Sequence, residues 1–300
     1  MSQGRTWDRL GWAIGALAIV GLLMTPTIAT AQTVATAQTA APAAGPNTGA
    51  VSVQWTNTIV TQYIFRGVQL ENNGLIYQPD LLLNFALYEG DGLLQSLDAY
   101  IEIWNSLHSE NTGWANSNQP WFETRYIVGV SGGLPEGFTL DTFMVFYTSP
   151  NGAFNAITEL DIKLAYDDTD LMAGAGLPAL APYFLVAIEL EEPADGENTY
   201  FELGIAPSAT IIESETAPVT LTIPVTLGLA GDRYYYDGCE TFGFVRVGLD
   251  FSMPVTCIPA EYGAWDASAG VALVFANDDI EVAGQDDIEV LGQFALTMSY

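Results

Sequence analysis

Large apolar side chains recur at every second position through most of this chain. In the segment 288–300, Ile288, Val290, Phe294, Leu296 and Met298 alternate with mostly polar residues. A period of two is the signature of a β-strand with one apolar and one polar face. The same pattern predicts twelve strands, over residues 51–65, 75–87, 97–107, 122–134, 138–146, 160–166, 180–190, 201–209, 219–229, 245–253, 265–275 and 288–300.

The length of these segments and of their connections favours one β architecture. Soluble strands usually have five or six residues, whereas about ten tilted residues are needed to cross a bilayer. Short connections such as "EGDG" and "PEG" alternate with longer polar ones such as "HSENTGWANSNQP", as in bacterial outer-membrane proteins. We therefore predict an all-β fold, a transmembrane antiparallel up-and-down β-barrel of about twelve strands over residues 51–300. A secreted β-sandwich is the alternative, and "DDTDLMAGAGLP" is long for a periplasmic turn.

The start of the chain has the layout of an export signal. Arg5 and Arg9 precede an apolar run from Leu10 to Met24, and Ala29-Thr30-Ala31 offers a cleavage site. We expect residues 1–31 to be a signal peptide and the Ala/Thr/Pro-rich residues 32–50 to be a flexible lead-in. A retained anchor is the alternative, although the apolar run is short for a spanning helix. Export through this signal predicts a location in the bacterial outer membrane.

The last strand carries a pattern that is typical of barrel insertion. Its alternate apolar residues end on an aromatic ring, and amphipathic rings prefer the membrane interface. We predict that this strand closes the barrel against the first one, so that no strand edge faces lipid. Its interfacial insertion signal would comprise Phe294, Leu296, Met298 and Tyr300. The partners implied are outer-membrane lipid and the barrel-assembly machinery.

Charge and residue counts exclude several classes of function. The chain has 36 acidic residues against 7 basic ones, so nucleic acid, whose phosphates need basic partners, is excluded as a partner. One His and two Cys, Cys239 and Cys257, cannot assemble a His/Cys metal cluster, and we expect no metal and no cofactor. The predicted tenth strand separates the two Cys, which places them at opposite ends of the barrel and excludes an intramolecular disulfide.

A family resemblance enters at "QYIFRGVQ". This segment resembles the first-strand motif of the TorF-type porin family through Tyr63, Phe65, Arg66, Gly67, Val68 and Gln69, with Gln62 in place of that motif's acidic residue. The segments "LPEGFTLD" and "PAEYGAW" are also similar to it, but they are short. The resemblance implies a porin-like role without a known substrate.

Parity along the predicted strands assigns a set of charged residues to the inner wall. These lumen-lining charges are Arg66, Asp98, Glu102, Glu123, Arg125, Glu159, Asp161, Lys163, Glu189, Glu202, Arg246 and Asp250. Eight carboxylates against four cations leave residual negative charge, and such rings favour cations. We expect Arg66 to pair with a carboxylate of a neighbouring strand, the ordinary way to hold a charge inside a barrel.

Two further features decide between functions. Ser106, His108 and Ser109 offer a Ser–His pair, but Ser106 and His108 lie on the lumen face rather than on the outer surface, so we expect no enzyme. Large inward residues can fill a narrow barrel, and here they are Tyr100, Trp104, Tyr183, Tyr200 and Phe244.

A tandem duplication precedes the last strand. "DDIEVAGQ" at Asp278–Gln285 is followed by "DDIEVLGQ" at Asp286–Gln293, with seven of eight positions identical. Eight is even, so slipping by one copy keeps every side chain on its face. We expect the second copy to span the membrane and the first to extend the last two strands into an outer loop.

The sequence thus predicts a porin-like channel for passive diffusion of small solutes, with a preference for cations. The alternative is a structural or surface-interaction barrel whose lumen is filled by side chains and does not conduct. The oligomeric state stays open, with a homo-oligomer among the choices.

Overall fold

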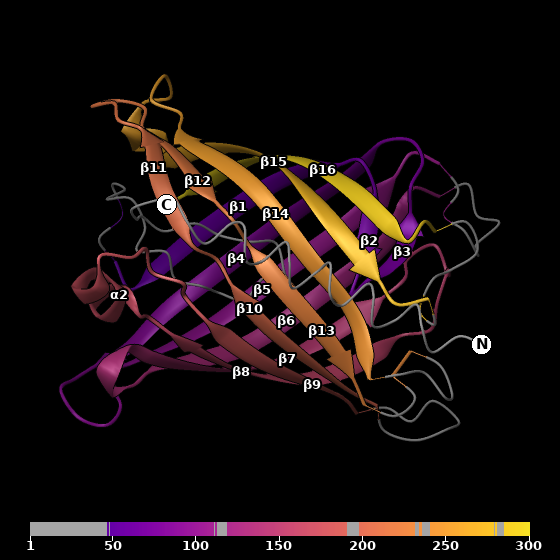
Figure 1. Ribbon diagram of the computed structural model, residues 1–300, viewed down its shortest axis with the longest axis horizontal. Coiled ribbons are helices and arrows are strands. Elements are labelled where there is room, and N and C mark those ends of the chain that lie inside the picture. Colours follow the sequence, from indigo (N-terminus) through magenta and orange to yellow (C-terminus); the bar gives the residue numbers. More distant parts are fainter. Residues whose placement is uncertain are drawn as a thin grey trace.

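The predicted strands are present and close into a barrel (Figure 1). The computed structural model describes residues 47, 49–110, 112, 119–190, 198–231, 234–235, 241–278, 280 and 285–300. The wall strands are β1 (Val51–Val60), β4 (Ile76–Glu89), β5 (Ser96–His108), β6 (Trp121–Gly133), β7 (Phe138–Thr148), β8 (Ile157–Tyr166), β9 (Tyr183–Glu189), β10 (Thr199–Ile205), β11 (Ser208–Ile212), β12 (Val219–Thr222), β13 (Val225–Ala230), β14 (Phe242–Pro254), β15 (Ala264–Ala276) and β16 (Ile288–Ser299).

Prolines divide two of the twelve wall strands. Pro207 separates β10 from β11, and Pro224 separates β12 from β13, because proline has no N–H for the ladder. Pairing continues through these breaks: the Ile223 N–H donates to Pro207 O at 2.9 Å and the Gly248 N–H donates to Pro224 O at 2.8 Å. The fourteen wall segments of the sheet therefore form twelve antiparallel wall strands, as the sequence pattern predicts.

The first and last strands form the closing seam. β1 pairs with β16 from Gln54↔Ser299 to Val60↔Gln293. Val53 and Tyr300 then exchange both backbone hydrogen bonds, each 2.8 Å long. This seam confirms the predicted closure and removes the sandwich alternative. We call the barrel end that holds Val51 and Tyr300 the base, and the opposite end the mouth.

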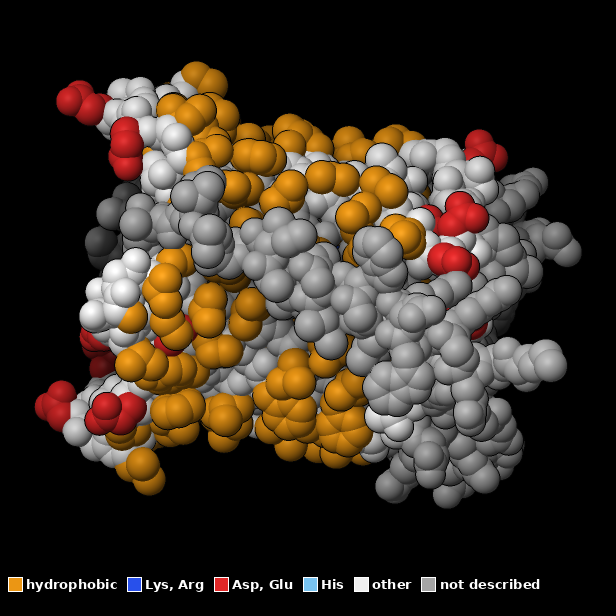
Figure 2. Space-filling model, viewed as in Figure 1, with side chains coloured by type: hydrophobic (Ala, Val, Ile, Leu, Met, Phe, Trp, Pro, Cys, Tyr) orange, Lys and Arg blue, Asp and Glu red, His pale blue; other side chains and the backbone are white. Residues whose placement is uncertain are grey.

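Alternation decides which side chains face outward. On β6, Tyr126 and Val128 are both 48% exposed, whereas Arg125 and Ile127 between them are 4% and 2% exposed. Outward positions on the other strands are likewise apolar and exposed. Figure 2 shows apolar side chains across the middle of the visible face, with carboxylates near its two ends; we call this exposed apolar surface the apolar belt.

The connections at the base follow the prediction, including its exception. The turn between β6 and β7 is the short 3-10 helix η1 (Pro135–Gly137), and η2 (Ala260–Tyr262) lies between β14 and β15. The long segment after β8 contains helix α2 (Thr169–Ala175). The buried Asp168 carboxylate joins the two ends of this segment, because it accepts hydrogen bonds from the backbone N–H groups of Leu180 and Ala181. Among the described residues no helix is both long and apolar enough to cross a membrane.

The predicted first strand is wrong beyond Val60. The chain leaves the wall there and forms a second, two-stranded sheet, β2 (Tyr63–Phe65) and β3 (Val68–Glu71). Arg66 and Gly67 make the turn with φ of 48° and 88°, and positive φ at both central residues is the requirement of a type I′ hairpin turn. The alternation of Tyr63 and Phe65 therefore belongs to a hairpin folded inside the barrel, which we call the inner hairpin (Figure 1).

Closure of the wall leads to a test in detergent. With no unpaired edge, the barrel should resist SDS until it is heated, because opening it breaks a whole strand ladder at once. Unboiled protein should migrate as a compact band distinct from the boiled one. Two coincident bands, together with solubility in the absence of detergent, would contradict a membrane barrel.

Candidate functional site

The inner hairpin is fixed to the wall by a buried ion pair. The two terminal nitrogens of the Arg66 guanidinium, Nη1 and Nη2, donate to Glu159 on β8, at 2.8 and 3.1 Å. Asp161, two residues further along the same strand, lies 3.7 Å from Arg66. The guanidinium also lies over the Tyr200 ring, 4.3 Å from its centre. The carboxylate partner expected for Arg66 is therefore present, although Arg66 belongs to the hairpin rather than to a wall strand.

A second charged pair holds the first strand of the hairpin. The Tyr63 hydroxyl donates to Glu123 at 2.9 Å, and Arg125 donates both to Glu123, at 2.6 Å, and to the Tyr63 oxygen. The Arg125 guanidinium lies 4.4 Å from the ring centres of both Phe65 and Trp104. Charge pairing and stacking thus join the hairpin to β5 and β6.

The mouth loops cover the hairpin from outside. The first copy of the tandem repeat contributes Gln285, which accepts the Gln69 N–H at 3.0 Å and donates to Gly67 O at 2.8 Å. Ile280 of the same copy is fully buried, and a Cβ on Gly67 would stand 2.8 Å from it. The Tyr235 hydroxyl donates to Arg66 O at 2.8 Å. We call Ile280 and Gln285 the cap.

The cap corrects the expectation for the repeat. β15 ends at Ala276 and β16 begins at Ile288, so neither strand extends into the described residues of the first copy, Asp278, Ile280 and Gln285. The second copy does continue into the wall strand. Equivalent isoleucines consequently differ in environment, because Ile280 is buried under the mouth whereas Ile288 faces outward and is 49% exposed.

Most of the wall charges predicted to line the lumen are buried in the interior. Nine of these residues are between 0 and 9% exposed, namely Glu102, Glu123, Arg125, Glu159, Asp161, Lys163, Glu202, Arg246 and Asp250. Asp98 and Glu189 are half-buried. Arg66, the twelfth residue of the predicted set, is 6% exposed on the hairpin.

The hairpin brings only some of these charges together. Arg66, Glu159 and Asp161 form one group, and Glu123 with Arg125 forms another. Glu202 instead accepts from Tyr183 and Tyr200, at 2.7 and 2.6 Å, and Asp250 accepts from Gln293 at 2.7 Å. Asp98 lies towards the base, where it accepts from Asn84 at 3.2 Å.

Several interior residues were not anticipated from the sequence. Asp141 on β7 is 3% exposed and Tyr147 is 5% exposed, and the Tyr147 hydroxyl donates to Glu159 at 2.8 Å. Strand parity would have placed both inside, since each alternates with an outward apolar residue. Tyr234 comes from a mouth loop and accepts from Arg66; burial raises the pKa of its phenol, which therefore stays protonated. No strand pattern could have indicated that contact.

The predicted inward residues partly fill the barrel. Tyr100, Tyr200 and Phe244 are buried at 0–5% exposure, while Trp104 and Tyr183 are partly exposed. Tyr100 and Tyr200 belong to one apolar cluster that also includes Phe143 and Phe244. Hairpin residues Ile64, Phe65 and Val68 pack against this cluster. Side chains of wall and hairpin together occupy the middle of the lumen.

The Ser–His pair lies on the inner face. Ser106 Oγ is 2.8 Å from His108 Nε2, Nδ1 of the same ring contacts Thr112, and the imidazole stacks on Phe122. Both residues are buried. Cys257 is exposed in a base connection and forms no disulfide within the described residues. Cys239 lies outside them, so the predicted absence of a bridge stays a prediction. No cluster of metal-ligating side chains occurs in the described part of the chain.

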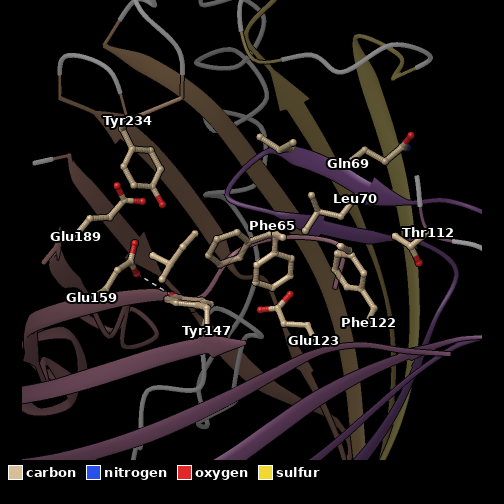
Figure 3. Close-up of a pocket in the computed structure, with 14 residues that line it drawn as sticks. Phe65, Gln69, Leu70, Thr112, Phe122, Glu123, Tyr147, Glu159, Glu189 and Tyr234 are labelled. Carbon is tan, nitrogen blue, oxygen red and sulfur yellow. Dashed lines mark hydrogen bonds between the residues drawn. The ribbon is translucent and has the colours of Figure 1, made fainter. Parts of the chain in front are cut away.

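A cavity of about 220 Å³ lies between the inner hairpin, the mouth loops and the mouth ends of strands β6 to β9. Its walls are mainly apolar and aromatic. Figure 3 shows Glu159, Glu189 and Tyr234 on one side and Thr112 and Phe122 on the other, with Phe65 and Tyr147 between them. We call it the mouth cavity.

Comparison with known proteins gives structural likenesses only. No family model matches the chain and no curated protein matches it, so the TorF-type resemblance rests on the segment around Arg66, which lies in the inner hairpin. Solved structures that are similar include the NanC porin (12% identity, 83% of this chain, 99% of that chain, TM-score 0.43). The COG4313 outer membrane channel from Pseudomonas putida F1 is similar over 83% of this chain and 94% of that chain, at 8% identity and TM-score 0.45. The beta domain of the Bordetella autotransporter BrkA matches 84% of this chain and 99% of that chain, at 11% identity and TM-score 0.43. The assignment of a barrel rests on this chain's own strand pairing.

Proposed function

We propose that this chain is an outer-membrane channel for small solutes, closed in the conformation described here by its inner hairpin. The location is supported by the exposed apolar belt, because a soluble protein rarely exposes so large an apolar surface. In a membrane the same belt would face lipid, with the base in the periplasm and the mouth outside. The terminal strand β16 would then carry the insertion signal for the barrel-assembly machinery.

The charged inner wall is the observation that carries the proposal of a channel. Burying carboxylates is costly, and a lumen that served only as a core would be more stable with apolar residues of similar volume. Ionisable residues inside a membrane protein typically mark solute or ion pathways. Here acidic side chains from β5, β6, β8, β10 and β14 project into one lumen.

The burial of those charges indicates the closed state. A pore wide enough for a solute exposes its lining to water, yet Glu102 and Asp161 are 0% exposed. The inner hairpin lies against Asp161 through Arg66, and side-chain contacts of Tyr63 and Arg66 join it to the wall. Movement of this hairpin is therefore the step that we propose opens the path.

A filled, non-conducting barrel is the second candidate function, and one observation favours it. Tyr100, Phe143 and Tyr200, which belong to the wall itself, are at most 1% exposed. If they block the lumen without help from the hairpin, the protein is a structural or surface-interaction barrel. Conductance of the purified protein in a planar bilayer separates the two candidates.

Cation preference is the expected result when the channel conducts. The eight predicted inner-wall carboxylates, together with Asp141, outnumber the four predicted cations, and a low-dielectric wall focuses their field. Reversal potentials across a KCl gradient should therefore favour K⁺ over Cl⁻ at low salt. The preference should weaken as the screening length falls from about 10 Å at 0.1 M to about 3 Å at 1 M.

Neutral variants make this selectivity test specific. Asp98→Asn together with Glu189→Gln should reduce the preference, because both side chains are only half-buried and reach solvent in the lumen. Glu261→Gln, on the exposed base turn, is the matched control and should leave it unchanged. An anion preference in the wild type at low salt would mean that the net charge of the conducting path has the opposite sign.

A further inference from the structure

We infer that the mouth cavity binds a small aromatic molecule that carries one positive charge. This inference names a substrate class for the proposed channel. Passage of the molecule through the barrel rests on the proposed function, whereas its binding in the cavity does not. The cavity lies where a solute arriving from outside would first meet the inner hairpin. Its lining combines aromatic rings with carboxylates, which are the two chemical features that such a molecule requires.

The apolar part of the cavity sets the size and nature of the ligand. Phe65 and Leu70 from the hairpin, Phe122 and Tyr147 from the wall, and Phe154 from a mouth loop line it. An apolar cavity of about 150 Å³ holds one benzene molecule. A volume of about 220 Å³ therefore fits one ring with a short side chain.

The charged part follows from the register of β8 and β9. Glu159 stands directly opposite Glu189 across these strands, and like charges in that position destabilise a sheet. Arg66 forms its ion pair with Glu159 and also lies near Asp161. Glu189 accepts only an amide hydrogen bond, from Asn198 at 2.9 Å, among the described residues. An ammonium group at Glu189 would relieve the repulsion between the two carboxylates.

The geometry of the cavity joins these two parts. Glu189 and Tyr234 lie on one side, and the aromatic side chains of Phe65 and Phe122 lie across from them (Figure 3). A ring held among the aromatics would therefore place a two-carbon amine near Glu189. Aromatic rings also attract cations through their faces, so the aromatic lining is compatible with the ammonium group of a ligand that enters the cavity.

Three probes that share a para-fluorophenylethyl skeleton and carry a positive, a neutral or a negative head group test the inference. Fluorine NMR of detergent-solubilised, folded protein would measure the affinities of para-fluorophenethylamine, para-fluorophenethyl alcohol and para-fluorohydrocinnamate. We expect the amine to bind roughly tenfold more tightly than the alcohol, the usual gain from a hydrogen bond to a charged group. The carboxylate probe should bind most weakly, because it meets Glu159 and Glu189.

Two variants assign the binding to this cavity. Glu189→Gln should remove the advantage of the amine and leave the affinity for the alcohol unchanged. Ala153→Trp, which fills the cavity from its lining, should abolish binding of all three probes. Glu213→Gln, an exposed carboxylate at the base, is the matched control. Each variant must keep its compact unboiled band, so that loss of binding is not loss of fold.

Other outcomes would overturn the inference. Equal affinity for the three probes, or no binding of the amine, would remove the charged site. Tighter binding of the carboxylate than of the amine would also do so. Because binding is measured without a membrane, a barrel that binds the amine but never conducts would contradict the proposed channel alone.

Discussion

Replacing residues 62–73 by a Gly/Ser segment of equal length should convert a barrel with little steady conductance into one that conducts continuously. The replacement removes Tyr63, Phe65 and Arg66 from the lumen, together with their contacts to β6 and β8. It leaves the wall intact, because β1 ends at Val60 and β4 begins at Ile76. Single-channel recording in a planar bilayer measures the effect, and we expect a several-fold increase in mean current.

The control for this replacement is a loop at the other end of the barrel. Residues 213–218 connect β11 and β12 at the base, and a Gly/Ser exchange there should leave the current unchanged. Both variants should keep the compact unboiled band in SDS. A folded hairpin variant with unchanged current would contradict the gate and favour the filled barrel, with Tyr100, Phe143 and Tyr200 as the block.

Arg66→Gln should lower the free energy of unfolding by about 3–5 kcal/mol, the cost of leaving a buried charge without its partner. Glu159 and Asp161 are 2% and 0% exposed, so water cannot take the place of the guanidinium without rearrangement. Urea titration of the barrel in lipid micelles, followed by tryptophan fluorescence, measures the loss as a lower midpoint.

A second substitution distinguishes charge from shape in this pair. In the Arg66→Gln/Glu159→Gln double variant the uncompensated charge is smaller, so the double variant should be more stable than Arg66→Gln alone. Glu261→Gln should change stability by no more than about 0.5 kcal/mol, as surface substitutions usually do. If the double variant loses the sum of the two single losses, the ion pair is not what holds the hairpin.

The wall could be predicted from the sequence because its information is local. Each strand alternates apolar and polar residues, and closure follows because the two edge strands of a sheet in lipid must pair with each other. The faces of Arg125 and Glu159 follow from the same parity. What parity cannot give is distance across the lumen: the ion pair between Arg66 and Glu159 joins residues 93 positions apart, and no strand register brings them together.

The inner hairpin escaped prediction for a related reason. Tyr63 and Phe65 continue the alternation of β1, so the pattern alone extends the strand. The contrary signal was the pair Arg66-Gly67, a two-residue turn between alternating apolar residues, followed by the turn at Gly74, where φ is 69°. Two such signals within twelve residues indicate a hairpin. Whether a hairpin folds into the barrel depends on the ion pairs that it forms with wall strands, and those strands lie far from the hairpin in the sequence.

The duplicated octapeptide allows the length of a mouth loop to change without changing which side chains of the next strand face lipid. One copy serves as the cap over the inner hairpin, through Ile280 and Gln285, while the other begins β16. A descendant chain that loses or gains one copy changes by eight residues, an even number that preserves the lipid and lumen faces of β16. A change in the number of copies would therefore alter the cap from one generation to the next and leave the inward and outward faces of the wall strands unchanged.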